Sequence, residues 1–180
     1  MNTNLEQLYN HYTKYPKIST DTRNIEKNSL FFALSGDNFD GNKFAEEALN
    51  KGAQFAVISD PELNKDGRFL LVEDTLQALQ NLAKFHRNTL KIPVIGITGS
   101  NGKTTTKELI KSALSEKHNV FATQGNLNNH IGVPLSLLSI TAEHQIAIIE
   151  MGANHQKEIE FLANICNPDC GLITNIGKAH

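Results

Sequence analysis

One stretch decides the fold of this chain, namely Ile95-Gly96-Ile97-Thr98-Gly99-Ser100-Asn101-Gly102-Lys103-Thr104-Thr105-Thr106. An apolar run from Ile92 to Ile97 stops at a short loop with two glycines, and a helical pattern follows the threonines. This order predicts a strand, a phosphate-binding loop and a helix N-terminus, where backbone N–H groups and the helix dipole attract phosphate. The stretch therefore predicts a site for ATP or a related nucleotide.

The polar residues of this loop have separate expected roles. Lys103 supplies a positive charge for the outer phosphates, and Thr104 supplies a hydroxyl for Mg²⁺. The loop reads G-x-x-G-K-T and is shorter than the general G-x-x-x-x-G-K-[ST] pattern, because Ile97 stands five positions before Gly102. A glycine-rich turn with a solvated lysine is the alternative, which the flanking strand and helix disfavour. The expected ATP-binding residues are Gly99, Ser100, Asn101, Gly102, Lys103, Thr104 and Thr105.

The composition is that of an ordinary globular protein, with 39% hydrophobic and 20% charged residues among 180. A net charge of −2 gives no basic surface for nucleic acid. Because neither a signal peptide nor a membrane-spanning run is found, we expect a cytoplasmic protein without membrane insertion. For Cys166 and Cys170 we expect two buried or half-buried thiols, with a metal pair or a disulfide as the alternatives.

Hydrophobic periodicity predicts an α/β fold in two parts, residues 1–90 and 91–180, with Lys91-Ile92-Pro93 at the boundary. The first part reads as a mixed α/β domain in which Ser35 to Asn42 form a polar loop. The second part alternates strands and helices, and its near-continuous apolar strands predict a mostly parallel sheet. The expected strands are 30–34, 55–58, 69–72, 94–98, 120–122, 145–150 and 171–174.

Polar residues follow the ends of three strands of the second part, where ligands bind to parallel sheets. Lys103 follows one strand, Glu150 ends another, and His180 comes shortly after a third. Beside a phosphate loop, Glu150 is expected to bind Mg²⁺, with a solvated strand-end charge as the alternative. His180 is either a second cation ligand or only a terminal histidine. Between Gly125 and Pro134 stand three asparagines; helix capping explains one of them, and the others suggest a polar site.

Taken together, these segments resemble the Mur ligases, the ATP-dependent amide-bond enzymes of bacterial cell-wall synthesis. The shortened G-x-x-G-K-T spacing is the one that this family shows. The asparagine-rich stretch and Glu150-Met151-Gly152-Ala153-Asn154 point to the member that joins D-alanyl-D-alanine to UDP-N-acetylmuramoyl-tripeptide. The likeness is carried by 19–23, 29–36, 40–44, Gly52-Ala53, the phosphate loop, 125–135, 150–154 and 173–180.

The resemblance implies a reaction in the bacterial cytoplasm and a set of ligands. ATP phosphorylates the peptide carboxylate to an acyl phosphate, which the amine of D-alanyl-D-alanine attacks as phosphate leaves. Both reactants of the first step are anions, so cations must screen them. Lys103 would hold the outer phosphates and Thr104 one Mg²⁺, while Glu150 and His180 resemble the ligands of a second Mg²⁺. The implied catalytic residues are Lys103, Glu150 and His180, and the implied metal ligands are Thr104, Glu150 and His180.

The same resemblance makes the first part, 1–90, a UDP-sugar-peptide substrate domain, and the second part, 91–180, the start of a phosphate-loop ATPase domain. For Arg23 a surface salt bridge is the alternative to substrate binding. Asn128 and Asn129 would help to hold the nucleotide or the substrate. The full set of implied substrate-binding residues is Thr20, Asp21, Thr22, Arg23, Ser35, Gly36, Asp40, Asn128 and Asn129.

Two departures from the family pattern limit these expectations. Asn42 stands where the family usually has histidine, so no chemical role is expected for it. Family members also continue well beyond His180, so we expect a fragment with an incomplete ATPase sheet, open strand edges and no ligase turnover alone. The alternatives are another Mur or folylpolyglutamate-type ligase and, from a different class, a non-catalytic nucleotide-binding module.

Overall fold

The computed structural model describes residues 2–36 and 39–177. It separates into two units, Met1–Leu82 and Ala83–His180, and the separation falls inside helix α3 (Thr75–Thr89). The two predicted parts, 1–90 and 91–180, have their boundary a few residues later and stay a prediction. Among the described residues, no helix combines the length and the apolar character needed to cross a membrane.

A parallel four-stranded sheet in the order β1-β2-β5-β6 forms the centre of the first unit. Three of these strands confirm the predicted ones, and β1 is an addition. The periodicity did not mark β1 because it is three residues long with one buried side chain. The bounds are β1 (Lys17–Ser19), β2 (Ser29–Phe32), β5 (Phe55–Ile58) and β6 (Phe69–Leu71).

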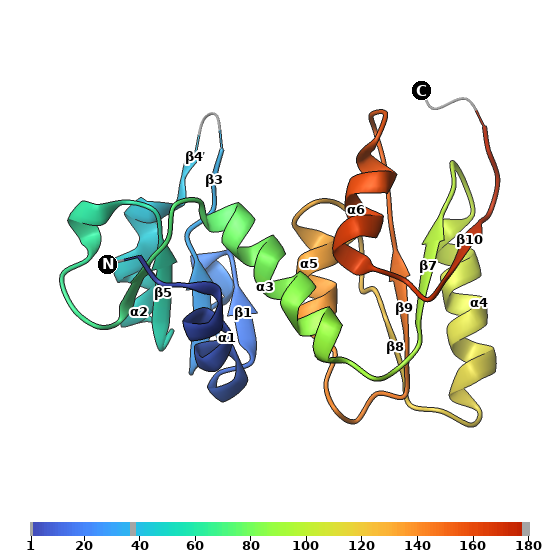
Figure 1. Ribbon diagram of the computed structural model, residues 1–180, viewed down its shortest axis with the longest axis horizontal. Coiled ribbons are helices and arrows are strands. Elements are labelled where there is room, and N and C mark those ends of the chain that lie inside the picture. Colours follow the sequence, from blue (N-terminus) through green and yellow to red (C-terminus); the bar gives the residue numbers. More distant parts are fainter. Residues whose placement is uncertain (1, 37–38, 178–180) are drawn as a thin grey trace. The chain divides into compact units, whose positions relative to one another are not determined.

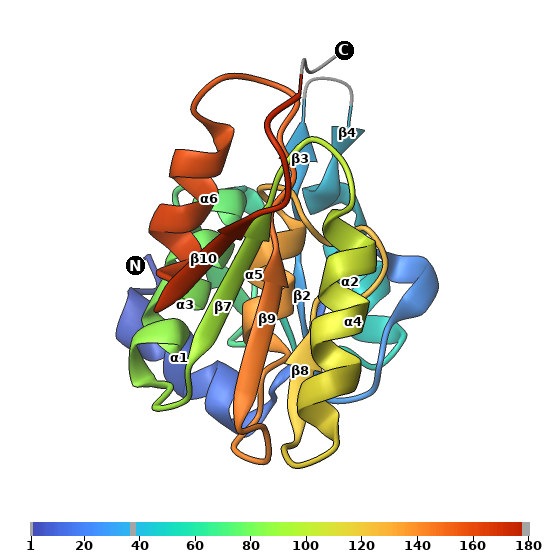
Figure 2. The same ribbon diagram turned by 90° about the vertical axis from the view of Figure 1, so that its right-hand side faces the viewer.

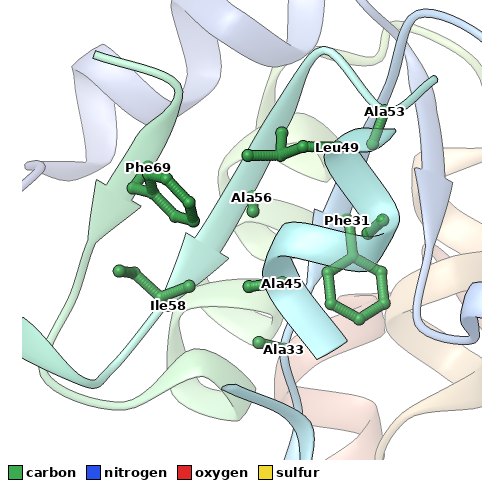
Figure 3. Packing of buried hydrophobic residues seen from close by; sticks show 9 residues of the cluster. Phe31, Ala33, Ala45, Leu49, Ala53, Ala56, Ile58 and Phe69 are labelled. Carbon is green, nitrogen blue, oxygen red and sulfur yellow. The ribbon is translucent and has the colours of Figure 1, made fainter. Parts of the chain in front are cut away.

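Two helices, α1 (Leu5–Lys14) and α3, begin in the first unit at residues that cap their N-termini. Helix α1 begins with a reciprocal pair of hydrogen bonds between Asn4 and Gln7. The Asp74 carboxylate accepts a bond from the backbone N–H of Gln77 at the start of α3. Helix α2 (Ala45–Asn50) packs its alanines against the sheet, as Figure 3 shows for Ala45 near the side chains of β5. Small side chains allow this close approach of helix and sheet.

The segment 35–42 is not a plain loop, contrary to the prediction. It contains a short antiparallel hairpin of β3 (Ser35–Gly36) and β4 (Phe39–Asp40), and a 3₁₀ turn, Gly41–Phe44, follows it. The sequence pattern missed the hairpin because each strand has two residues, which is too short for an alternation of apolar and polar side chains. Two further 3₁₀ turns cover Thr22–Asn24 and Pro61–Leu63.

The second unit also contains a four-stranded sheet, in the order β10-β7-β9-β8, and all its pairs are parallel. Figure 1 shows α4 on one face of this sheet and α5 and α6 on the other. The four predicted strands are confirmed as β7 (Val94–Thr98), β8 (Val120–Ala122), β9 (Ile146–Glu150) and β10 (Cys170–Ile173). The helices are α4 (Lys103–Ser115), α5 (Gly132–Leu138) and α6 (Glu158–Cys166).

The strand order places the phosphate loop between two other strand ends. Strand β7 lies between β10 and β9, as Figure 2 shows, and its end is level with theirs because Ile97 pairs with Glu150 and Thr98 with Ile173. Residues that leave β7, β9 and β10 therefore meet at one edge of the sheet, as predicted. Ile110 and Leu114 of α4 pack against the buried side chains of this sheet.

A buried arginine fixes the end of α3 within the second unit. Arg87 is 6% exposed and donates to the carbonyl of Asn167 (2.9 Å) and to the Asp169 carboxylate (2.9 Å), which also accepts the Val94 N–H (2.7 Å). Both cysteines nearby are free. Burial raises the pKa of the Cys166 thiol to about 12. Cys170 is exposed, so the expectation of a buried or half-buried thiol is wrong for it, because β10 is the edge strand.

Candidate active site

Two glycines of the phosphate loop adopt backbone conformations that other residues rarely reach. Gly99 has φ +135°, and a Cβ at this position would collide with Oγ1 of Thr174. Gly102 has φ +81° and forms the N-cap of α4, so the helix begins at Lys103 with its N-terminus at the loop. The structure therefore confirms the predicted sequence of strand, loop and helix N-terminus.

The chain that leaves β10 holds the loop from the side. The backbone N–H of Asn101 donates to Oδ1 of Asn175 (2.9 Å), and Oγ1 of Thr174 donates to the Asn101 carbonyl (2.6 Å). The N–H of Gly177 donates to Oγ of Ser100 (2.9 Å). The loop shape thus depends on residues more than seventy positions later. The role of Thr174 and Asn175 was missed, because local sequence gives no sign of this pairing.

Lys103 lies over the loop that it follows. Its Nζ donates to the carbonyl of Gly99 (2.7 Å), so the ammonium group stays next to the loop rather than pointing into solvent. A pocket of about 490 Å³ opens here between the loop and the exits of β9 and β10. Thr105 is exposed on the first turn of α4. A cationic side chain at a helix N-terminus beside such a pocket suits a polyphosphate.

Glu150 brings three distant segments together at the end of β9. Its side chain is 2% exposed. Oε2 accepts a hydrogen bond from Oγ1 of Thr104 on α4 (3.0 Å), and Oε1 accepts one from Nδ2 of Asn128 (2.9 Å). Its backbone N–H donates to Oγ1 of Thr123, beyond β8 (3.0 Å). Glu150 is therefore not the solvated strand-end charge of the alternative interpretation.

The donor set at Glu150 fits Mg²⁺. A carboxylate oxygen and a threonine hydroxyl lie 3.0 Å apart, and Mg²⁺ prefers such oxygen ligands. Within residues 2–36 and 39–177, no three His, Cys, Asp or Glu side chains are grouped so that they could hold a metal ion. Mg²⁺ commonly takes one or two protein oxygens and completes its shell with phosphates and waters, so Thr104 and Glu150 suffice. The predicted ligand His180 lies outside the described residues.

The two neighbouring asparagines have different contacts. Asn128 reaches Glu150, as described. Oδ1 of Asn129 accepts the backbone N–H groups of Ile131 (3.1 Å) and Gly132 (2.8 Å), at the start of α5. Asn129 thus accepts backbone N–H groups in the turn that leads into α5, a local bonding role close to the capping expected for one asparagine of this stretch. A contact of Asn129 with substrate stays a prediction.

A buried lysine next to Glu150 escaped the sequence reasoning. Lys107 is 1% exposed, and its Nζ donates to the Thr123 carbonyl (2.6 Å) and lies 4.0 Å from Oε2 of Glu150. The signal was present, because Lys107, Ile110 and Leu114 recur at helical spacing and place a charged residue on the apolar face of α4.

In the first unit, the predicted residues Thr20 to Arg23 line a pocket of about 550 Å³ together with three phenylalanines. Nε of Arg23 donates to both carboxylate oxygens of Asp21 (2.9 Å each). These bonds hold the pKa of Asp21 at about 2. The arginine side chain is 85% exposed. Arg23 therefore forms the salt bridge of the alternative interpretation and still borders the pocket.

The other predicted substrate residues of this unit lie on the hairpin and not in that pocket. Oγ of Ser35 donates to Oδ1 of Asp40 (3.3 Å), and Gly36 is exposed. A hydrogen bond from the Asn42 side chain lowers the pKa of Asp40. Two rings line the pocket instead, Phe39 of the hairpin and Phe44 of the 3₁₀ turn after it, and they are stacked with their centroids 5.4 Å apart. Sequence reasoning assigned these rings no role in the site.

Asn42 holds the hairpin in place. It is 8% exposed, and its Oδ1 accepts the backbone N–H groups of Ser59 (3.0 Å) and Asp60 (3.3 Å). Its Nδ2 donates to Asp40 (3.0 Å). The position where the resemblance expected histidine thus carries a buried amide that links the hairpin to the chain after β5.

The parallel sheet, the glycine loop at a helix N-terminus and the carboxylate at the adjacent strand end define a phosphate-loop nucleotide-binding protein. Two family models match the chain: "Mur ligase family, catalytic domain" over residues 14–87 and "Mur ligase middle domain" over residues 97–180. The chain therefore belongs to the Mur ligase family, as the motifs predicted.

Its similarity lies with one branch of this family. The UDP-N-acetylmuramoyl-tripeptide–D-alanyl-D-alanine ligase of Bacillus subtilis is 46% identical over 166 residues, which cover 91% of this chain and 36% of that protein. A crystal structure of MurF from Acinetobacter baumannii matches with a TM-score of 0.85 and 42% identity, over 91% of this chain and 36% of that one. MurF of Thermotoga maritima in complex with ADP matches with a TM-score of 0.81 and 35% identity, over 91% and 38%. The chain spans a little over a third of the length of these relatives.

Proposed function

We propose that this chain supplies the ATP site and the nucleotide-sugar site of a ligase that joins D-alanyl-D-alanine to UDP-N-acetylmuramoyl-tripeptide. The names of its relatives support the substrates. The observation that carries the proposal is the convergence of Thr104, Asn128 and Glu150 beside the phosphate loop. We also propose the bacterial cytoplasm as its location, by analogy with the family.

The site suits the activation of a carboxylate. A carboxylate is a poor electrophile, and phosphate transfer from ATP makes it an acyl phosphate that an amine can attack. Lys103 would contact the outer phosphates, and Thr104 and Glu150 would hold Mg²⁺, which lowers the repulsion between the two anions. Asn128 orients Glu150 for this task through its hydrogen bond. His180 stays the proposed ligand of a second cation.

The pocket of the first unit suits a nucleotide-sugar. Thr20 to Arg23 offer hydroxyl, carboxylate and guanidinium groups, and the stacked Phe39 and Phe44 offer a flat apolar surface. Such a combination fits a diphosphate and a base or a sugar face. Ser35, Gly36 and Asp40 would act by shaping the hairpin that carries Phe39.

Calorimetric titration of the 180-residue chain with UDP-N-acetylmuramoyl-tripeptide tests the substrate, with UDP-N-acetylglucosamine as the control. We expect binding that is selective for the muramoyl-peptide and that weakens in Phe39→Ala. Equal binding of both ligands, or none by a chain with native circular dichroism, would contradict the substrate assignment.

The amine substrate requires a longer protein. In a chimera, residues 14–177 would replace the corresponding part of the Bacillus subtilis relative. We expect phosphate release that needs ATP, the tripeptide and D-alanyl-D-alanine together. Release supported instead by a single amino acid such as glutamate would favour another ligase of the superfamily, and binding without release in the chimera would favour a non-catalytic module.

A further inference from the structure

The buried Lys107 has none of the nucleotide-binding roles proposed for the phosphate loop. It follows Lys103 by four residues on α4, so both lysines lie on the same face of the helix. Lys103 lies at the loop, whereas Lys107 points into the protein and is 1% exposed. An ammonium group in the interior is costly unless it is paired, so a surface lysine would be the simpler solution here.

The surroundings of Lys107 contain two carboxylates of different kinds. Its Nζ lies 3.1 Å from Oε1 of Glu108, whose side chain is 57% exposed. It lies 4.0 Å from Oε2 of Glu150, whose side chain is 2% exposed. The Glu150 oxygen that faces the lysine is the same one that accepts the Thr104 hydroxyl bond. The lysine charge is thus next to the oxygen proposed to bind Mg²⁺.

The buried charges next to this oxygen are one carboxylate and one ammonium, because the Glu108 carboxylate 3.1 Å from the ammonium is mostly exposed and therefore screened by solvent. Glu150 contributes one negative charge to the interior and Lys107 one positive charge, and water is excluded from both side chains. A free divalent cation at Thr104 and Glu150 therefore meets a carboxylate whose charge is partly offset by a nearby ammonium, and the ammonium repels the cation. The phosphates of ATP add several negative charges and reverse this balance.

We propose that Lys107 makes Mg²⁺ binding at Thr104 and Glu150 depend on bound nucleotide. This inference rests on the proposed function of that site as a Mg²⁺–ATP site. Lys107 acts through Glu150 and the local charge, so it is a positioning residue and not a catalytic one. As a consequence, the chain binds Mg²⁺ together with the nucleotide and not before it.

Mn²⁺ is a suitable probe, because its electron paramagnetic resonance signal reports the free ion directly. The wild-type chain is titrated with Mn²⁺ alone and then with Mn²⁺ in the presence of ATP. Because ATP itself binds Mn²⁺, the second titration is compared with the same ATP without protein, and only the additional loss of free Mn²⁺ is counted as binding by the chain. We expect weak binding of Mn²⁺ alone and clearly tighter binding with ATP. In Lys107→Met we expect Mn²⁺ alone to bind roughly tenfold tighter or more, since a unit charge about 4 Å away is removed from a dry site.

Matched variants separate this charge effect from general damage. Glu108→Gln removes the exposed carboxylate partner of Lys107, and it should leave the affinity for Mn²⁺ alone within about twofold, because surface charges are well screened. Lys107→Arg keeps the charge and should behave as the wild type. Adding Glu150→Gln to Lys107→Met should abolish the gained binding. If Lys107→Met does not fold, Lys107→Gln takes its place.

The outcomes test the metal–nucleotide site and the role of Lys107 separately. If the wild type shows no Mn²⁺ binding even with ATP, the proposed metal–nucleotide site fails. If it does bind, but the uncharged variants show unchanged affinity for Mn²⁺ alone, the inference about Lys107 is overturned while the site stands. Loss of folding in both uncharged variants, with Lys107→Arg intact, would reduce Lys107 to a structural ion pair and overturn the inference as well.

Discussion

The two candidate sites of this chain are held together in different ways. At the phosphate loop, the functional groups come from α4, the exits of β9 and β10 and the asparagine-rich segment, and Glu150 at the centre is 2% exposed. At the pocket of the first unit, Asp21 and Arg23 are neighbours in sequence, and the Arg23 side chain is 85% exposed. We infer that the first site is fixed by long-range burial, whereas the Asp21–Arg23 pair of the second site is fixed by bonds between sequence neighbours.

This difference predicts where substitutions act on binding and where they act on folding. Substitution of a side chain that other residues hold in place should weaken only the binding of its ligand. Substitution of a side chain that holds other residues in place should first lower the free energy of unfolding. Paired variants at the two sites therefore test this distinction.

Lys103→Met should weaken the binding of ATP with Mg²⁺ by about a hundredfold, because it removes the charge that faces the outer phosphates. Calorimetry with ATP measures the loss, and Lys117→Met on an exposed position is the control. Binding of UDP-N-acetylmuramoyl-tripeptide should not change. A loss of both ligands together would show that the two sites are not independent.

Asn42→Ala should lower the free energy of unfolding by about 2 kcal/mol, because the backbone N–H groups of Ser59 and Asp60 lose their buried acceptor. Urea denaturation followed by circular dichroism measures this change, with the exposed Asn81→Ala as the control. We expect weaker binding of the nucleotide-sugar and unchanged binding of ATP. Unchanged stability would mean that the hairpin does not depend on Asn42.

Asn128→Ala should weaken Mg²⁺-dependent ATP binding roughly tenfold, because Glu150 loses one of the two side chains that donate hydrogen bonds to its carboxylate. Its neighbour is the matched control: Asn129→Ala removes the acceptor of two backbone N–H groups in the turn that leads into α5, and it should cost about 1 kcal/mol of stability with little effect on ATP. Titrations of ATP with and without Mg²⁺, beside urea denaturation, measure the two effects. The opposite assignment of effects would reverse the roles given to these asparagines.

The smallest expected effect is a pH-dependent difference in stability between the wild type and Asp21→Asn, in the pocket of the first unit. The pKa of Asp21 is about 2 in the folded protein, below the ordinary value of 3.8, because Arg23 donates hydrogen bonds to it. Its stabilising contribution is therefore complete above about pH 4 and is lost as the pH falls towards 2. Thermal unfolding of the wild type and of Asp21→Asn should differ by a constant small amount from pH 7 to pH 5 and converge near pH 2. A difference that already changes near pH 6 would implicate another group.

The sequence predicted what depends on near neighbours. The phosphate loop, the strand that ends at Glu150 and the cap at Asp74 follow from local patterns of glycine, charge and apolar spacing. It could not predict contacts that need the finished sheet. The clamp of Asn175 on Asn101 and the bond of Asn128 to Glu150 join residues that are far apart in the chain.

The hairpin and the buried lysine show two further limits. The strands β3 and β4 are too short for a periodic signal, so Phe39 was not expected in a pocket. Lys107 carried a periodic signal, but a lysine on an apolar helix face is rare enough that the pattern is easily read as a solvated charge. For Lys107, the position on the apolar face of α4 indicated burial better than the residue type did.

Hydrogen–deuterium exchange of the 180-residue chain tests most directly the central claim that the phosphate loop binds ATP and that the pocket of the first unit binds the nucleotide-sugar. With ATP and Mg²⁺, we predict added protection of amides at 98–106, 123–129 and 150–153, and none at 20–44. With UDP-N-acetylmuramoyl-tripeptide alone, we predict protection at 20–24 and 39–44, where the nucleotide-sugar would bind. Protection of 20–44 by ATP, or no protection of the phosphate loop by ATP with Mg²⁺, would contradict the account.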